Sequence, residues 1–257
     1  MKRFRSLISI PFILTILTLG VGIYFLYWKF QLGLVRYFDI DEFAYLWWTS
    51  HMHQGVMPYR DFLFGVTPGF LWFLSPLFAF FHGVTPMVVG RILMCIVFTS
   101  LAVSAGVLFW EMRKSWLAVA VPLFLIFLPL PADKFLEIRP DTLSLLFVLL
   151  GMVFLVHVMN RKAGAFLVGA AAFSFACSLV TLQKTLPIVG ISGICFLGWC
   201  LNSLRAKTLS KRLCWQFFSA ALIGSGIVGV LTVCWLLLRV GDMKIVWYSL
   251  TRLPIEI

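Results

Sequence analysis

Charged residues are scarce in this sequence, and acids are the scarcest of them. Only 12% of the 257 residues are charged, with ten Asp and Glu against 21 Lys and Arg, whereas 61% are hydrophobic. A water-soluble domain of this length needs more charge to cover its surface. The composition therefore predicts an all-α polytopic membrane protein, with residues 1–257 forming a single transmembrane domain.

Several motifs that carry known chemistry are also missing. The sequence has no Gly-rich phosphate loop, no GxSxG elbow and no HExxH motif. Its six cysteines form no CxxC pair and no metal-ligand spacing with histidine, so we expect them to be small apolar residues in the membrane. His51 and His53 would project to different faces of a helix, which disfavours a shared metal ion.

The net charge of +11 does not indicate a nucleic-acid partner. The basic residues stand in short clusters between apolar runs, a pattern typical of the loops on the cytoplasmic side of a membrane protein. The partner that this distribution predicts is the membrane itself.

Seven apolar runs are long enough to cross about 30 Å of hydrocarbon. They cover residues 7–28, 87–110, 115–131, 141–159, 165–182, 185–202 and 214–238. The first run follows a basic N-terminus but continues to Trp28 without a cleavage site, so it is interpreted as an uncleaved span. An eighth run, 66–82, is short and contains Pro76.

Charge decides whether the run 66–82 crosses the membrane. If it lies on the surface, one side of the membrane holds eleven Lys and Arg and a single acid, Glu111. That excess marks the cytoplasm. The sequence thus predicts about seven transmembrane helices in the plasma (inner) membrane with a cytoplasmic N-terminus, juxtamembrane helices in a large first outer loop at 29–86, and a second outer loop at 132–140.

The first outer loop contains the acidic run Asp39-Ile40-Asp41-Glu42. One interpretation makes Asp41 a helix N-cap and Glu42 a first-turn partner of the helix dipole. The other makes Asp41 and Glu42 catalytic, as a base or a metal ligand at the interface. Three acids within four residues exceed what one cap requires, so Asp41 and Glu42 are candidate catalytic residues.

Further candidates lie in the later outer segments. Arg139 and Asp141 flank Pro140, where they either start a helix or share a polar cavity with the first acidic run. Lys184 stands between two apolar runs, as an interfacial lysine in a turn or as a phosphate ligand. Arg60 and Arg91 are further candidates for binding phosphate.

Four segments in this order resemble the GT-C superfamily of membrane glycosyltransferases, which includes the protein O-mannosyltransferases and the lipid A aminoarabinose transferase. They are DEFAYL, GVMPYRDFLFGVTPGFLWFLSPLFAFF, GRILMCIVFTSLAV and EIRPDTLSLLFVLLG. The resemblance implies a polyprenyl-phosphate sugar donor and a lipid, glycan or protein acceptor on the outer face. It also implies Asp41 as the catalytic base, Asp141 as a second acidic site residue, and Arg139 and Lys184 beside the lipid phosphate.

Members of that superfamily are usually longer, so we expect this chain to correspond to their N-terminal membrane part. No cofactor follows from the motifs, although a divalent metal ion is one way to assist the departure of the phosphate. Two other functions fit the same residues. They are a lipid-linked sugar carrier or flippase, and a non-catalytic membrane subunit or truncated relative.

Overall fold

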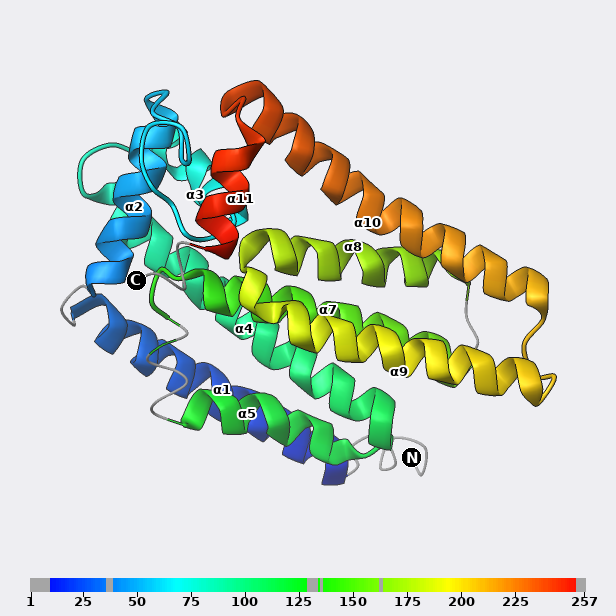
Figure 1. Cartoon of the computed structure of the whole chain (residues 1–257). Coiled ribbons are helices and arrows are strands. Elements are labelled where there is room, and N and C mark those ends of the chain that lie inside the picture. The colour runs from blue at the N-terminus through cyan, green and yellow to red at the C-terminus, as the bar shows by residue number, and fades with distance from the viewer. Residues whose placement is uncertain (1–9, 36–38, 129–133, 135, 162–163, 253–257) are drawn as a thin grey trace.

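A computed structural model describes residues 10–35, 39–128, 134, 136–161 and 164–252 (Figure 1). The predicted basic head at residues 2–5, parts of the 132–140 loop and the last residues from 253 lie outside the described residues. Within them the protein is all-α, and its only β-type pairing is an isolated bridge between Pro58 and Phe62. The predicted all-α class is confirmed.

The helices follow one another along the whole chain. They are α1 (Ile10–Val35), α2 (Ile40–His53), α3 (Gly69–Phe80), α4 (Thr85–Arg113), η1 (Trp116–Val119), α5 (Ala120–Phe127), α7 (Pro140–Arg161), α8 (Ala165–Thr181), η2 (Gln183–Thr185), α9 (Leu186–Arg205), α10 (Lys211–Arg239) and α11 (Met243–Thr251).

Four stretches are long and apolar enough to cross a membrane. They are Thr85–Arg113, Pro140–Asn160, Gln183–Arg205 and Lys211–Arg239. The other predicted crossings correspond to shorter apolar helices, Leu19–Val35, Trp116–Phe127 and Ala165–Thr181. The protein is thus a helical membrane protein, and its full set of seven crossings stays a prediction.

The run predicted to cross at 115–131 is not one continuous helix. The run contains the short 3₁₀ helix η1 followed by α5, and α5 ends at Phe127. Leu128 has extended backbone angles, φ −61° and ψ 124°. Pro129 follows it in the sequence, and the residue before a proline is pushed out of the helical region. The apolar run therefore extends further than the helix.

The long helices pack side by side in the order α4, α7, α8 and α10, with α9 against α7 (Figure 1). Helices α1 and α5 pair with each other and with α4. The α8–α10 contact depends on two glycines, because a Cβ on Gly224 would overlap the backbone oxygen of Gly169. Small residues of this kind let membrane helices approach closely.

Helices α2, α3 and α11 gather at one end of the bundle (Figure 1). Leu46 of α2 packs with Phe70 and Leu74 of α3 in a buried cluster. Val246 of α11 packs in a second cluster with residues of α3 and α10. Helices α2 and α3 also pack against α4 and α7, near the acids at the starts of α2 and α7.

Candidate functional site

A capping box begins α2. The backbone N–H of Asp41 donates to Oδ1 of Asp39 at 3.0 Å, and the backbone N–H of Asp39 donates to Oε2 of Glu42 at 3.1 Å. The interpretation of Asp41 as the N-cap is therefore wrong, because Asp39 is the extended residue before the helix. The hydrogen bond from Asp41 holds the pKa of Asp39 below its ordinary value of 3.8. The Asp41 carboxylate takes no part in the cap.

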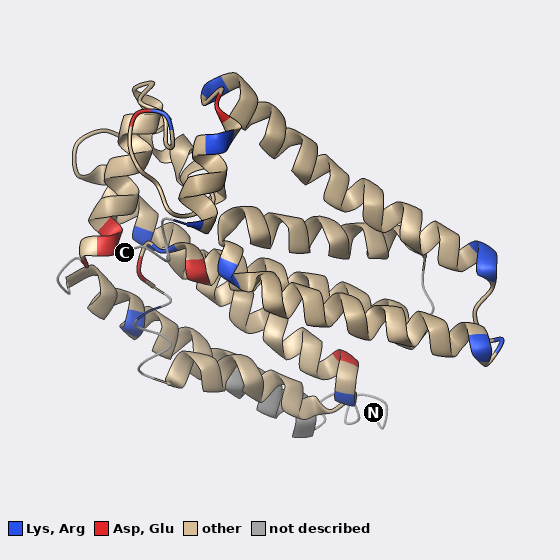
Figure 2. Cartoon of the chain, viewed as in Figure 1, with Lys and Arg blue, Asp and Glu red and all other residues tan. Residues whose placement is uncertain are grey.

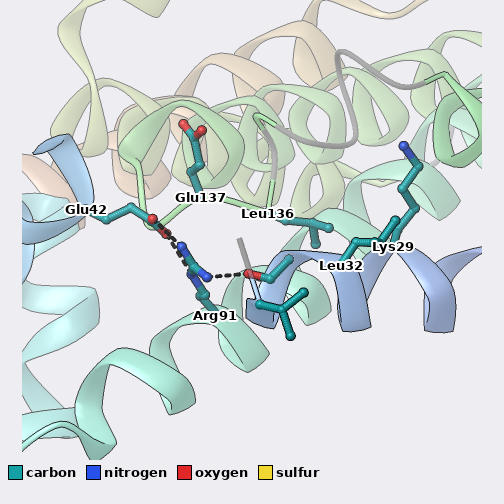
Figure 3. Close-up of a pocket in the computed structure, with 8 residues that line it drawn as sticks. Lys29, Leu32, Glu42, Arg91, Leu136 and Glu137 are labelled. Carbon is teal, nitrogen blue, oxygen red and sulfur yellow. Dashed lines mark hydrogen bonds and ion pairs between the residues drawn. The ribbon is translucent and has the colours of Figure 1, made fainter. Parts of the chain in front are cut away.

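Glu42 lies fully buried against Arg91 of α4 (Figure 3). Arg91 Nη2 is 2.6 Å from Oε2 of Glu42, and Arg91 Nε is 3.1 Å from Oε1. The backbone N–H of Ile138 also donates to Glu42, at 3.1 Å, while Arg91 donates to the carbonyl oxygen of Gly33. This forked, buried pair ties together the end of α1, the start of α2, the helix α4 and the segment before α7.

Arg139 lies between three acids. Its Nη2 is 3.0 Å from Oδ2 of Asp41, its Nη1 is 3.4 Å from Oε2 of Glu137, and its Nε is 3.6 Å from Oδ2 of Asp141. Burial by itself lowers the pKa of Arg139, but the negative charges of Asp41 and Asp141 raise this pKa by more than burial lowers it. The pKa of Arg139 therefore lies above its ordinary value. The structure therefore brings together Asp41, Arg139 and Asp141, three of the candidate site residues.

These three side chains remain open to solvent. The exposed fraction is 48% for Asp41, 49% for Asp141 and 30% for Arg139. Glu137, in contrast, is 1% exposed and is held by Lys134 Nζ at 2.9 Å. That hydrogen bond is the main cause that raises the pKa of Lys134. Asp41 and Asp141 are thus accessible to solvent, whereas the buried Glu137 helps to hold Arg139 in place.

A cavity of about 300 Å³ adjoins the buried pair (Figure 3). It is lined by Lys29, Leu32, Gly33, Val35, Glu42, Arg91, Leu136 and Glu137. Its volume is at the lower limit of ordinary ligand pockets. Asp41 does not line it, so the exposed carboxylates face a separate, open surface.

Lys184 lies at the same end of the bundle as Asp141. It belongs to η2, which is joined to α7 through Ser178. Ser178 donates to Thr185 Oγ1 at 2.8 Å, and Ser144 of α7 bonds Ser178 at 3.0 Å. Lys184 is exposed and forms no ion pair with any described residue. Its ammonium group is therefore available to an anion.

Arg60 lies apart from this cluster. Its Nη2 is 2.7 Å from Oδ2 of Asp61, and it donates to the carbonyl oxygens of Gly55 at 3.1 Å and Arg239 at 3.3 Å. Arg239 is the last residue of α10. Arg60 therefore joins its own loop to the end of α10, and the structure does not bring it to Asp41.

The described residues do not form a donor set suited to a metal ion. They contain no group of three or more His, Cys, Asp or Glu that could hold one. Asp41 and Asp141, the exposed acids, both face the guanidinium of Arg139 instead. His51 Nδ1 lies 3.0 Å from the carbonyl oxygen of Trp47.

Sequence reasoning missed the roles of Glu137 and Lys134, which stand in the second acidic segment. Their spacing of three residues is typical of an ion pair within one turn of helix, and Lys134 and Glu137 do pair with each other. Arg91, a candidate for binding phosphate, is instead buried in an ion pair with Glu42. Its partner is distant in the sequence, so no local spacing predicts this pair.

Figure 2 shows how the charges divide. Acids stand near the start of α2 and of α7. At the opposite end of the bundle, where α9 ends and α10 begins, the charged residues among those described are all basic. Comparisons of the chain with protein-family models, characterised proteins and solved structures find no match. A function is therefore inferred from the residues and their geometry.

Proposed function

We propose that the protein is a glycosyltransferase of the GT-C type. It transfers a sugar from a polyprenyl-phosphate donor to a hydroxyl group of a lipid, glycan or protein acceptor. In this proposal seven helices cross the plasma (inner) membrane from a cytoplasmic N-terminus, and the site faces outward. The main support is the position of Arg139 between Asp41 and Asp141, which joins the two acidic motifs of the resemblance.

The reaction needs a base and a cation. Asp41 accepts the proton of the acceptor hydroxyl as its oxygen attacks the anomeric carbon. The bond from that carbon to the phosphate oxygen breaks, and the polyprenyl phosphate leaves with the electron pair. A direct displacement of this kind inverts the configuration at the anomeric carbon. Half of the Asp41 side chain is accessible, which suits contact with an acceptor.

In this proposal, binding of the donor to Arg139 releases Asp41, the base, from its ion pair. Arg139 is held by Asp41 and Asp141, and the anionic phosphate of a donor can accept two parallel hydrogen bonds from the same guanidinium. When Arg139 turns to the phosphate, Asp41 loses its partner and can accept a proton. Arg139 then stabilises the charge that grows on the leaving phosphate.

The remaining candidates have different roles in this proposal. Lys184 is a second phosphate ligand, because it is exposed and lies near the start of α7. Glu42 is a positioning residue, because its carboxylate is buried and held by Arg91. Arg60 has no part in donor binding, since its contacts hold a loop to the end of α10.

Mass spectrometry of the lipids that co-purify in mild detergent tests donor binding. The wild type should retain a polyprenyl-phosphate sugar, and an Arg139→Ala, Lys184→Ala double variant should lose it. Arg60→Ala is the matched control and should retain it. Recovery of bulk phospholipid alone from all three proteins contradicts the proposal.

A carrier or a non-catalytic subunit is the second candidate. The observation in its favour is that Asp41 is already paired with Arg139 and does not line the cavity of about 300 Å³ beside Glu42. This candidate predicts that the protein retains the lipid-linked sugar but leaves it intact when acceptors are added. Release of free polyprenyl phosphate with a glycosylated acceptor supports the transferase.

A further inference from the structure

Most of the surface of the helices α9 and α10 is exposed. Only 11% of the most apolar stretch of α9 and 17% of that of α10 is buried, compared with 39% for α4 and 44% for α7. An open groove of about 600 Å³ runs between them at the end where they are joined. Its volume is within the range of ligand pockets.

The lining of this groove is apolar except at its mouth. It comprises Gly193, Phe196, Leu197, Cys200 and Leu204 from α9, and Lys211, Cys214, Trp215, Phe217, Phe218 and Ala221 from α10. Lys211, the one charged residue of this lining, is the first residue of α10. A ligand that fits must therefore be apolar along its length and anionic at one end.

The segment that joins the two helices is strongly basic. Arg205, Lys207, Lys211 and Arg212 are all exposed, and no described acid forms an ion pair with any of them. The sequence contains no Asp or Glu between Asp141 and Asp242. Figure 2 accordingly shows basic residues without acids where α9 ends and α10 begins.

The joining segment has a defined conformation. The backbone N–H groups of Thr208 and Leu209 both donate to the carbonyl oxygen of Ser203, at 2.9 and 3.2 Å. Leu209 packs in a buried cluster with Cys200 and Phe217, which also line the groove. The basic residues therefore sit on a folded turn at the mouth of the groove, beside the positive end of the α10 dipole.

We propose that this groove binds an anionic phospholipid. One acyl chain lies between α9 and α10, and the phosphate of the head group contacts Lys211 and its basic neighbours. Basic pockets between membrane helices bind anionic head groups in this manner. The apolar lining favours a lipid over an acidic peptide, which would leave its backbone polar groups unpaired in the groove. The inference does not depend on the proposed transferase activity.

Native mass spectrometry of the purified full chain tests this site, with phosphatidylglycerol or phosphatidylcholine added back after delipidation. The wild type should retain phosphatidylglycerol in preference to phosphatidylcholine. Arg205→Gln with Lys211→Gln should weaken retention of phosphatidylglycerol by about thirtyfold, since each basic residue near a membrane surface contributes on the order of 1 kcal/mol. Arg113→Gln with Arg161→Gln removes two charges at the same end of the bundle and should have little effect.

A second pair of variants tests the groove itself. Gly193 lines the groove and has open space at its Cβ position, so Gly193→Leu should fill the groove and lower phosphatidylglycerol retention. Gly190, one turn away, also has open space but does not line the groove, so Gly190→Leu should leave retention unchanged. Equal retention of the two lipids by the wild type overturns the proposal. So does unchanged selectivity in both the charge variant and Gly193→Leu.

Discussion

Arg139 reaches Asp41 at 3.0 Å, although one residue precedes α7 and the other stands in the first turn of α2. The same guanidinium lies 3.6 Å from Asp141. The two acidic segments therefore meet in the folded protein, with the cation of Arg139 between them.

The first prediction concerns Asp41 as the base. Asp41→Asn should lower the rate of sugar transfer by about 10² to 10⁴, because the amide cannot accept the acceptor's proton. The measurement is transfer of labelled sugar from the lipid donor that co-purifies with the wild type. Asp61→Asn removes an acid outside the cluster and should keep the wild-type rate. Full transfer by the Asp41 variant, with normal insertion of the protein, would exclude the assigned role.

The second prediction concerns the buried pair of Glu42 and Arg91. Glu42→Ala leaves the guanidinium of Arg91 buried without its carboxylate, and breaking a buried ion pair costs about 3 to 5 kcal/mol. Thermal unfolding in detergent should show a clear fall in the midpoint. The double variant Glu42→Leu, Arg91→Leu should be less affected, because it removes both charges. An unchanged midpoint for Glu42→Ala would show that the pair does not stabilise the fold.

The third prediction concerns the pH dependence of stability at the start of α2. The folded-state pKa of Asp39 lies below its ordinary value of 3.8, so the unfolded chain binds a proton more readily than the folded protein. The corresponding stability is present above about pH 4 and is lost as the pH falls through the lower folded pKa. Between about pH 5 and about pH 3, the unfolding midpoint of the wild type should fall more than that of Asp39→Asn. Parallel pH profiles would contradict this.

The fourth prediction concerns the close approach of α8 and α10. Gly224→Ala places a methyl group against the backbone of Gly169, and overpacking of this kind costs about 1 to 3 kcal/mol. The unfolding midpoint should fall. Gly226→Ala is the matched control, because nothing lies within 4 Å of the Cβ position of Gly226. Equal midpoints for the two variants would show that the helices separate without cost.

The sequence by itself determined the class of this protein and the approximate positions of its helices. Long apolar runs and scarce charge require helices in a membrane, because the backbone must satisfy its own hydrogen bonds there. The short run at 66–82 became the short helix α3, and the acids at 39–42 stand at a helix start. These features depend on residues close together in the chain, so a local pattern is sufficient to predict them.

The tertiary structure alone decided which charged residues meet. In the folded protein Glu42 is buried against Arg91, Arg139 lies between Asp41 and Asp141, and Arg60 contacts the end of α10. No spacing in the sequence predicts the contacts of Glu42 with Arg91, of Asp41 with Arg139 or of Arg60 with α10, because these partners are distant in the chain. The first two contacts form where α2 and α3 pack against α4 and α7, and there the burial of one charge requires an opposite charge beside it.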